Sequence, residues 1–275
     1  MSIQRNYFSI SENIFKRNSR NAIAVESSSE IVLQLSENQF IDNIGTAIVN
    51  LKTQRLSYKV VLELIKNQFI NNTGTTVVKL DTQGSSSNVV LEMTKNLFID
   101  NTGTDIVKLD TQDWSSEMVL QMSGNQFINN TGTAIVNLNN RASSSVMVLK
   151  MRQNQFINNT GTTIVNLNTQ GYTDVMTIFK NIWKHNFGHA MIRFNIPKYS
   201  KTSNFFDNEL TQNVISKKYP LLTEYFVNEA TIVHINGNFQ FKRNVFENPS
   251  AKYEFATQRH FHGETIDARF NWWGA

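Results

Sequence analysis

The chain has 275 residues, of which 40% are hydrophobic, so it is long enough to bury a sizeable core. It contains no cysteine, which excludes disulfide frameworks, cysteine-ligated zinc sites and cysteine nucleophiles. The formal net charge is +4, but the basic residues are scattered and Lys217-Lys218 is their densest group, so no nucleic-acid partner is expected. No signal peptide is visible in the first residues, and no apolar run is long enough to predict a membrane-spanning segment.

A nine-residue motif recurs along the first part of the chain. The copy at 125–133 reads NQFINNTGT, and related copies begin at 38, 67, 96 and 154. The interval between copies is 29 residues each time. A fixed period in this range is typical of stacked structural repeats.

Each period predicts three short strands. The first strand, at 89–93 for example, alternates apolar with polar residues, as a half-buried β-strand does. The second strand carries a phenylalanine, and the third strand follows a glycine and has a valine and a leucine two residues apart. The phenylalanine column consists of Phe40, Phe69, Phe98, Phe127 and Phe156.

Identical residues at a fixed period lie above one another when each period makes one turn of a coil, because each strand then pairs with its own copy about 4.8 Å away. We therefore predict an all-β fold, a right-handed parallel β-helix with three strands per turn and about ten turns, in which 1–275 is a single domain. Regular repeats span 31–170, and looser turns span 171–275. Residues 209–230 interrupt the pattern and are predicted to form an inserted loop or a short helix.

Two other columns have a structural explanation in such a coil. The asparagine before each phenylalanine is predicted to bond its side-chain amide to the copies above and below it, at a buried corner. The glycine of each motif, such as Gly74, is predicted to supply the positive φ that a tight corner needs. The asparagine ladder consists of Asn38, Asn67, Asn96, Asn125 and Asn154.

The end of the chain carries a more distinctive motif. The stretch ARFNWWGA at 268–275 contains Asn-Trp-Trp-Gly, and it follows turns of the type NVFENP. This combination resembles the right-handed β-helix repeats of the bark beetle (Anakonda) family, whose members are transmembrane proteins of insect tricellular junctions. The resemblance implies a non-enzymatic binding or adhesion scaffold, extracellular or at the cell surface, in a cell-junction protein. It also implies that 1–275 is a fragment, because in that family the chain continues beyond the glycine.

An enzyme is the alternative, because parallel β-helices include pectate-lyase-like and polygalacturonase-like enzymes with carboxylates and a basic residue on one outer face. The candidate catalytic residues are Asp42 and Asp100, which lie roughly 9.6 Å apart if each turn rises 4.8 Å. This separation overlaps the range for an inverting pair of carboxylates. Asp81 and Asp110 lie in the loop that follows. No column of Lys or Arg is expected beside these acids, which favours the scaffold.

The histidines give only a weak metal signal. His260 and His262 share one face of an extended segment, and His234 lies in an earlier strand, but no carboxylate or cysteine stands at ligand spacing. The sequence therefore predicts no metal and no cofactor.

The loop that joins the third strand to the next first strand differs in every copy. Its larger members, Leu56, Trp114 and Tyr172, are predicted to lie exposed on a rigid edge. Such side chains suit contacts with a glycan or with another protein. This loop edge is the predicted binding surface.

Two further predictions concern the surface and the ends. Asn71, Asn129 and Asn158 are N-glycosylation sequons, and all three occupy the same corner of the repeat, which should face solvent. The terminal turns should leave unpaired strand edges, so end-to-end self-association is expected.

Overall fold

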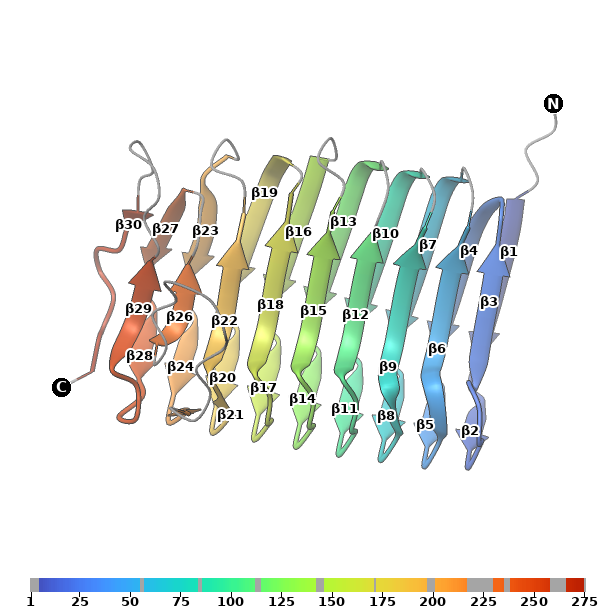
Figure 1. Cartoon of the computed structure of the whole chain (residues 1–275), viewed down its shortest axis with the longest axis horizontal. Coiled ribbons are helices and arrows are strands. Elements are labelled where there is room, and N and C mark those ends of the chain that lie inside the picture. Colours follow the sequence, from blue (N-terminus) through green and yellow to red (C-terminus); the bar gives the residue numbers. More distant parts are fainter. Residues whose placement is uncertain are drawn as a thin grey trace.

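The computed structural model describes residues 5–54, 57–83, 86–111, 115–141, 146–170, 172–196, 201–216, 230–234, 238–257 and 266–274. These residues form a parallel β-helix whose turns stack into a straight column (Figure 1). The predicted all-β solenoid with three strands per turn is confirmed. Within the described ranges no helix has the length and apolarity needed to span a membrane.

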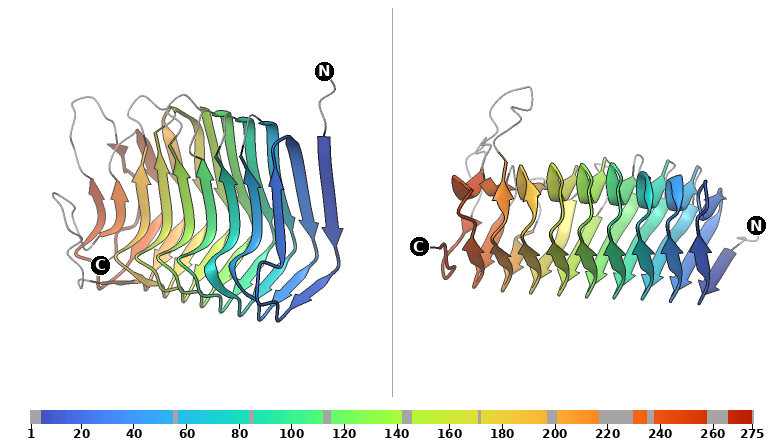
Figure 2. Two further views of the ribbon diagram at one scale, coloured as in Figure 1. Left: turned by 45° about the vertical axis from the view of Figure 1, so that its right-hand side comes forward. Right: turned by 90° about the horizontal axis from the view of Figure 1, so that it is seen from below.

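Three long parallel sheets form the sides of the column (Figure 2). We name them sheets A, B and C, in the order in which the chain passes through them. Sheet A consists of β1 (Arg5–Ser11), β4 (Glu30–Ser36), β7 (Ser57–Ile65), β10 (Ser86–Thr94), β13 (Ser115–Ser123), β16 (Val146–Arg152), β19 (Tyr172–Phe179), β23 (Ser203–Phe206), β27 (Phe239–Lys242) and β30 (Ile266–Asp267).

The other two long sheets are made of the second and third strands of each turn. Sheet B consists of β2 (Ile14–Lys16), β5 (Gln39–Ile41), β8 (Gln68–Ile70), β11 (Leu97–Ile99), β14 (Gln126–Ile128), β17 (Gln155–Ile157), β20 (Ile182–Lys184), β24 (Glu209–Thr211) and β28 (Val245–Glu247). Sheet C consists of β3 (Ile23–Ser27), β6 (Ile44–Thr53), β9 (Thr73–Thr82), β12 (Asp105–Thr111), β15 (Ala134–Asn140), β18 (Thr163–Thr169), β22 (Ala190–Asn195), β26 (Ala230–His234) and β29 (Tyr253–Thr257). A separate pair joins β21 (Phe187–Gly188) to β25 (Val214–Ile215).

Two details of the prediction are wrong. Fewer than the expected ten turns are complete in the described residues, because sheets B and C hold nine strands each and the last turn adds only β30 and a bridge from Trp272 to Val245. The interruption near 209–230 also begins later than predicted. Strands β24 and β25 continue the turn up to Ile215, because Asn208 and Asn213 occupy the same corners as the asparagines of the regular repeats. Residues 217–229 lie outside the described residues.

The core consists of identical columns stacked in register. In sheet A, Leu91 pairs with Leu62 on one side and Leu120 on the other, and all three are buried. The neighbouring Val90 lies on the outer face and is only partly buried. The rings of the phenylalanine column lie parallel, and the centroids of Phe69 and Phe98 are 4.6 Å apart. The strand spacing of a sheet thus sets the stacking distance of the aromatic core.

The glycines have a different role from the predicted one. None of the five motif glycines has a positive φ. The positive φ values fall instead on two other corner positions of each turn, for example 53° at Lys66 and 53° at Asn71. Glycine is required at its own position because a Cβ on Gly74 would lie 2.4 Å from the carbonyl oxygen of Gly45 in the neighbouring turn. Close backbone approach, and not backbone conformation, selects this residue.

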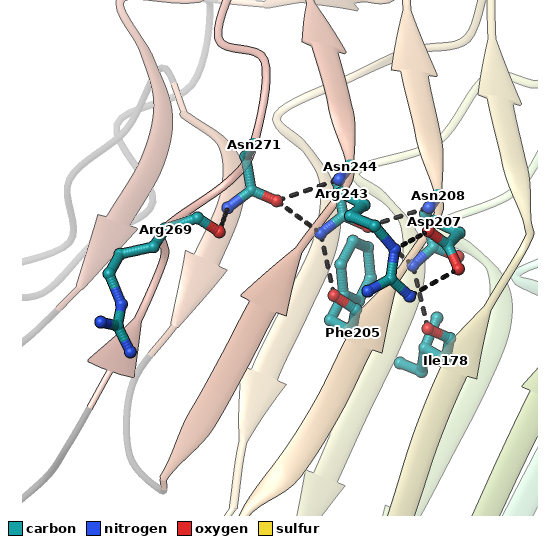
Figure 3. Close-up of polar contacts among 8 residues, drawn as sticks. All are labelled: Ile178, Phe205, Asp207, Asn208, Arg243, Asn244, Arg269 and Asn271. Carbon is teal, nitrogen blue, oxygen red and sulfur yellow. Dashed lines mark hydrogen bonds and ion pairs between the residues drawn. The ribbon is translucent and has the colours of Figure 1, made fainter.

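The asparagine ladder lies in the buried corner between sheets A and B. The Oδ1 atom of Asn96 accepts from the backbone N of Asn67 at 2.9 Å and from its Nδ2 at 3.1 Å. The Nδ2 atom of Asn96 donates to the carbonyl of Leu64 at 2.8 Å and to Oδ1 of Asn125 at 2.9 Å. Both amide donors and the oxygen are thereby paired, which burial requires. The ladder continues to Asn271, as Figure 3 shows for its last members.

A second ladder, which the prediction missed, occupies the corner between sheets B and C. All its members after the first are fully or almost fully buried, and they repeat the same bonds: the Nδ2 atom of Asn72 donates to the carbonyl of Phe40 and to Oδ1 of Asn101. Each turn is therefore closed at two corners by one asparagine each. The ladder begins at the exposed Asn18, and its buried members are Asn43, Asn72, Asn101, Asn130, Asn159, Asn186, Asn213 and Asn248.

Candidate functional site

Asp42 and Asp100 lie two turns apart in the corner that follows sheet B, each with a φ of 54°. Asn71 stands between them and donates from Nδ2 to Oδ1 of Asp42 at 2.9 Å. The Nε atom of Arg17 lies 3.8 Å from Oδ2 of Asp42. Asp100 is exposed, and it has no ion pair with another described residue. The carboxylates of Asp42 and Asp100 therefore have no partner in common. A pair of catalytic carboxylates would instead act together on one substrate bond.

The predicted loop edge falls mostly outside the described residues, because Leu56 and Trp114 belong to undescribed ranges. Tyr172 begins β19, and its side chain is 37% exposed. His260 and His262 also lie outside the described residues. In the part of the chain that is described, no three His, Asp or Glu side chains form a group that could hold a metal ion.

The three sequon asparagines occupy the corner that contains Asp42. Asn71, Asn129 and Asn158 are exposed, and so is the threonine two residues after each. Their φ values lie between 53° and 55°, in the left-handed region that asparagine tolerates better than most residues. The corner faces solvent because the next residue along, and not the sequon asparagine, forms the buried ladder.

A continuous set of polar side chains lies on the outer face of sheet C. Two columns alternate with the buried core columns along each strand, and register places their members one turn apart. We call these two columns the polar face. The first column contains Asn50, Lys79, Lys108, Asn137, Asn166 and Arg193, and the second contains Lys52, Asp81, Asp110, Asn139, Asn168 and Asn195.

Amide side chains of the polar face bond along the helix axis in one direction. In the second column, Asn195 donates to Asn168 at 2.7 Å, and Asn168 donates to Asn139 at 3.1 Å. This run ends where Asn139 donates to Oδ1 of Asp110 at 3.2 Å. Each bond joins an Nδ2 donor to a side-chain oxygen of the preceding turn, so a carboxylate, which only accepts, is the natural end of such a run.

A parallel run in the first column ends at Asp105, which the prediction did not include. Asn166 donates to Asn137 at 3.0 Å, and Asn137 donates to Oδ1 of Asp105 at 3.0 Å. Asp105 is only 4% exposed, and burial raises the pKa of its carboxyl above the ordinary value, although the bond from Asn137 and the charge of Lys108 oppose the shift. The outer face of sheet C thus holds a carboxyl whose charged form is disfavoured by desolvation.

Basic residues do stand beside the acids of this face, contrary to the expectation from the sequence. The Nζ atom of Lys79 lies 2.8 Å from Oδ2 of Asp81, and that of Lys108 lies 3.3 Å from Oδ2 of Asp110. The reason is the strand geometry, since residues two apart on a strand share one face. Both carboxylates are almost buried, at 2% and 6% exposure, so each lysine neutralises a charge that solvent barely reaches.

Two acceptors of the polar face are buried without a partner, Oδ1 of Asn50 and Oδ1 of Asp81. An unpaired buried acceptor costs about 1–3 kcal/mol. The face also keeps spare bonding capacity, because each amide in the runs uses one of its two N–H groups along the axis. Asn137, Asn139, Asn166, Asn168 and Asn195 are all half-buried, so this capacity is turned toward solvent.

Comparison of the chain with models of known protein families, with curated proteins and with solved structures gives no match. The resemblance to the bark beetle family therefore remains a hypothesis that rests on the Asn-Trp-Trp-Gly motif. The identification of the polar face, by contrast, depends on the strand register and hydrogen bonds of the structure and not on any resemblance. Its signal in the sequence is the alternation of Lys, Asp and Asn with apolar residues in segments such as VKLD and VNLN.

Proposed function

We propose that this chain is a non-catalytic binding scaffold that holds a neutral, hydroxyl-rich polymer, such as a linear polysaccharide, along the polar face of sheet C. The observation that carries the proposal is the pair of amide runs, Asn195 to Asp110 and Asn166 to Asp105, with donors and acceptors left over at every turn. Amides pair well with hydroxyl groups because both donate and accept. Their repeat of about 4.8 Å along a straight axis suits an extended ligand and not a compact one.

The rigidity of the site also supports a polymer ligand. The amides stand on paired strands, so little side-chain or backbone freedom remains to be lost on binding, and preorganisation of this kind increases affinity. Asp81 and Asp110 are paired with Lys79 and Lys108, and desolvation disfavours the charged form of the third acid, Asp105. The face therefore offers no uncompensated charge at these positions that would favour an acidic polymer over a neutral one.

Binding of neutral and acidic polysaccharides, measured by isothermal titration calorimetry, tests the proposal. The double substitution Asn137→Ala with Asn166→Ala should weaken binding of a neutral chain by roughly tenfold or more, since each lost hydrogen bond contributes about 1 kcal/mol. Gln121→Ala, on the outer face of sheet A, is the matched control and should leave affinity unchanged. Unchanged binding by the double variant, or preference for acidic chains, would contradict the proposal.

Cleavage of a polysaccharide is the second candidate function, and the two Lys–Asp pairs are the observation that favours it. A hydrolase or lyase needs carboxylates and a cation close together on one face, and the polar face has them. The same polysaccharides should be assayed for new chain ends. Turnover that disappears in Asp110→Asn, Asp42→Asn or Asp100→Asn would show that the scaffold is catalytic.

The extracellular or cell-surface setting, in an adhesion or junction protein, belongs to the same proposal. Its support is the resemblance carried by the Asn-Trp-Trp-Gly motif together with three exposed sequons, which matter only in a secreted protein. The protein partner that the loop edge would bind has no further support beyond the exposed Tyr172. Immunostaining of intact cells that express the chain within its natural transcript tests the location.

A further inference from the structure

The two ends of the β-helix are closed to different degrees. At the C-terminal end both asparagine ladders finish on acceptors supplied by nearby residues. Asn271 donates from Nδ2 to the carbonyl of Ala268 at 2.7 Å. It also donates to the carbonyl of Arg269 at 3.3 Å (Figure 3). Asn248 donates from its backbone N and from Nδ2 to the two carboxylate oxygens of Glu254, at 2.8 and 2.9 Å. Glu254 thus takes the place of the next asparagine.

The aromatic column finishes at the same end on Trp273, which is 40% exposed. The ring of Trp273 lies parallel to that of Phe246, with 4.7 Å between the centroids. The last strands of sheets A and C also carry charge, since β30 contains Asp267 and β29 contains Glu254. Charged residues on an edge strand oppose pairing with another chain.

At the N-terminal end the aromatic column finishes on Phe15, whose ring stacks on that of Phe40, but the two ladders are not closed within the described residues. Asn13 and Asn18 begin the two ladders, and the Oδ1 atom of each accepts no hydrogen bond from a described residue. Phe8 is in register with the buried Leu33, so it belongs to a core column, yet it is 46% exposed. The end of the core is therefore open here, with Ile10 and Phe15 only partly buried below it.

The edge strand at this end also lacks the usual protection. Strand β1 pairs with β4 on one side and has no described strand on the other. Apart from Arg5 at its start it contains no charged residue and no proline, and Tyr7 and Phe8 are exposed on its two faces. An edge strand without charge along most of its length is a template for pairing with another chain.

We infer that β1 is a homodimer interface in which two copies of the chain pair their β1 strands antiparallel about a two-fold axis. A strand edge is complementary to itself in antiparallel pairing, and two-fold dimers are the commonest closed assemblies. Head-to-tail stacking is disfavoured, because the ladder donors at the C-terminal end are already paired and the Glu254 carboxylate would face the open acceptor of Asn18 in the same ladder. The inference is independent of the polysaccharide site, since the polar face runs along the side of the column.

Light scattering coupled to size-exclusion chromatography of the full chain, over a wide range of concentration, tests the dimer. The wild type should be a dimer, and Phe8→Lys should raise the dissociation constant by roughly 100-fold, because the lysine would be desolvated without a partner. Phe270→Lys is the matched control at the other end, where Phe270 is 77% exposed, and it should leave the dimer intact. Circular dichroism checks that both variants are folded.

The absence of cysteine makes a cross-linking test clean. Tyr7, Phe8 and Ser9 are replaced by cysteine one at a time, and at least one variant should form a disulfide-linked dimer under mild oxidation, which requires Cα atoms within about 7 Å. Arg269→Cys should not cross-link. A monomeric wild type, dimers that persist in Phe8→Lys, or cross-links only through Arg269→Cys would each overturn the inference.

Discussion

Removal of one buried ladder asparagine should destabilise the β-helix more than removal of an asparagine on its surface. Asn96→Ala deletes four hydrogen bonds: two that Asn67 donates to its Oδ1 and two that its Nδ2 donates to Leu64 and Asn125. At about 0.5–1.5 kcal/mol of net stability for each bond, the expected loss is about 2–6 kcal/mol. The residue is 1% exposed, so water cannot replace these bonds without entering the corner.

The matched control is Asn168→Ala on the polar face, where the side chain is half-buried and makes two side-chain bonds. Solvent can replace these bonds, so its loss should be below about 1 kcal/mol. Urea unfolding measures both free energies, and hydrogen exchange reports whether the backbone N–H of Asn67 loses protection only in Asn96→Ala. Equal losses in the two variants, or unchanged protection at Asn67, would refute the account of the ladder as a structural necessity.

The remaining predictions concern the core, the buried acid and the sequons. Leu91→Ala should cost about 2–5 kcal/mol in urea unfolding, because it leaves a cavity in the core, whereas Val90→Ala on the outer face should cost clearly less; similar losses would mean that the strand faces are reversed. Burial raises the pKa of Asp105, so the folded state disfavours its charged form. The free energy of unfolding is therefore highest below the ordinary pKa of 3.8, and it falls as the pH rises through the raised pKa of the folded state. Asp105→Asn should therefore stabilise the chain at pH 7 relative to wild type, with a gain that vanishes near pH 3, and parallel pH profiles of the two proteins would contradict this. If the natural protein is secreted from eukaryotic cells, glycopeptide mapping should find glycan at the exposed sequons Asn71, Asn129 and Asn158. A secreted protein without glycan at all three would contradict their accessibility.

The repeat pattern in the amino-acid sequence is sufficient to predict the architecture of this protein. A 29-residue period with three alternating segments permits only a stack of turns, because every column of identical residues must lie one strand spacing above the last. The buried faces followed from the same pattern, so Leu91 could be placed inside and Val90 outside. The phenylalanine stack and the first asparagine ladder could be predicted as well, since stacked rings pack against one another and stacked amides hydrogen-bond to the copies above and below.

The roles of the corners and the outer faces become visible only in the folded chain, because they depend on backbone conformation that the period does not specify. Only the corner geometry shows that the positive φ falls on Asn71 and Lys66, while Gly74 is required by the carbonyl of Gly45 in the neighbouring turn. The second ladder could not be predicted from the sequence, because nothing in it distinguishes the adjacent Asn71 and Asn72. The structure shows that Asn72 is the one whose side chain lies in the buried corner. The polar face likewise depends on which side chain of one turn reaches an acceptor of another, so the link from Asn137 to Asp105 could not be predicted from columns alone.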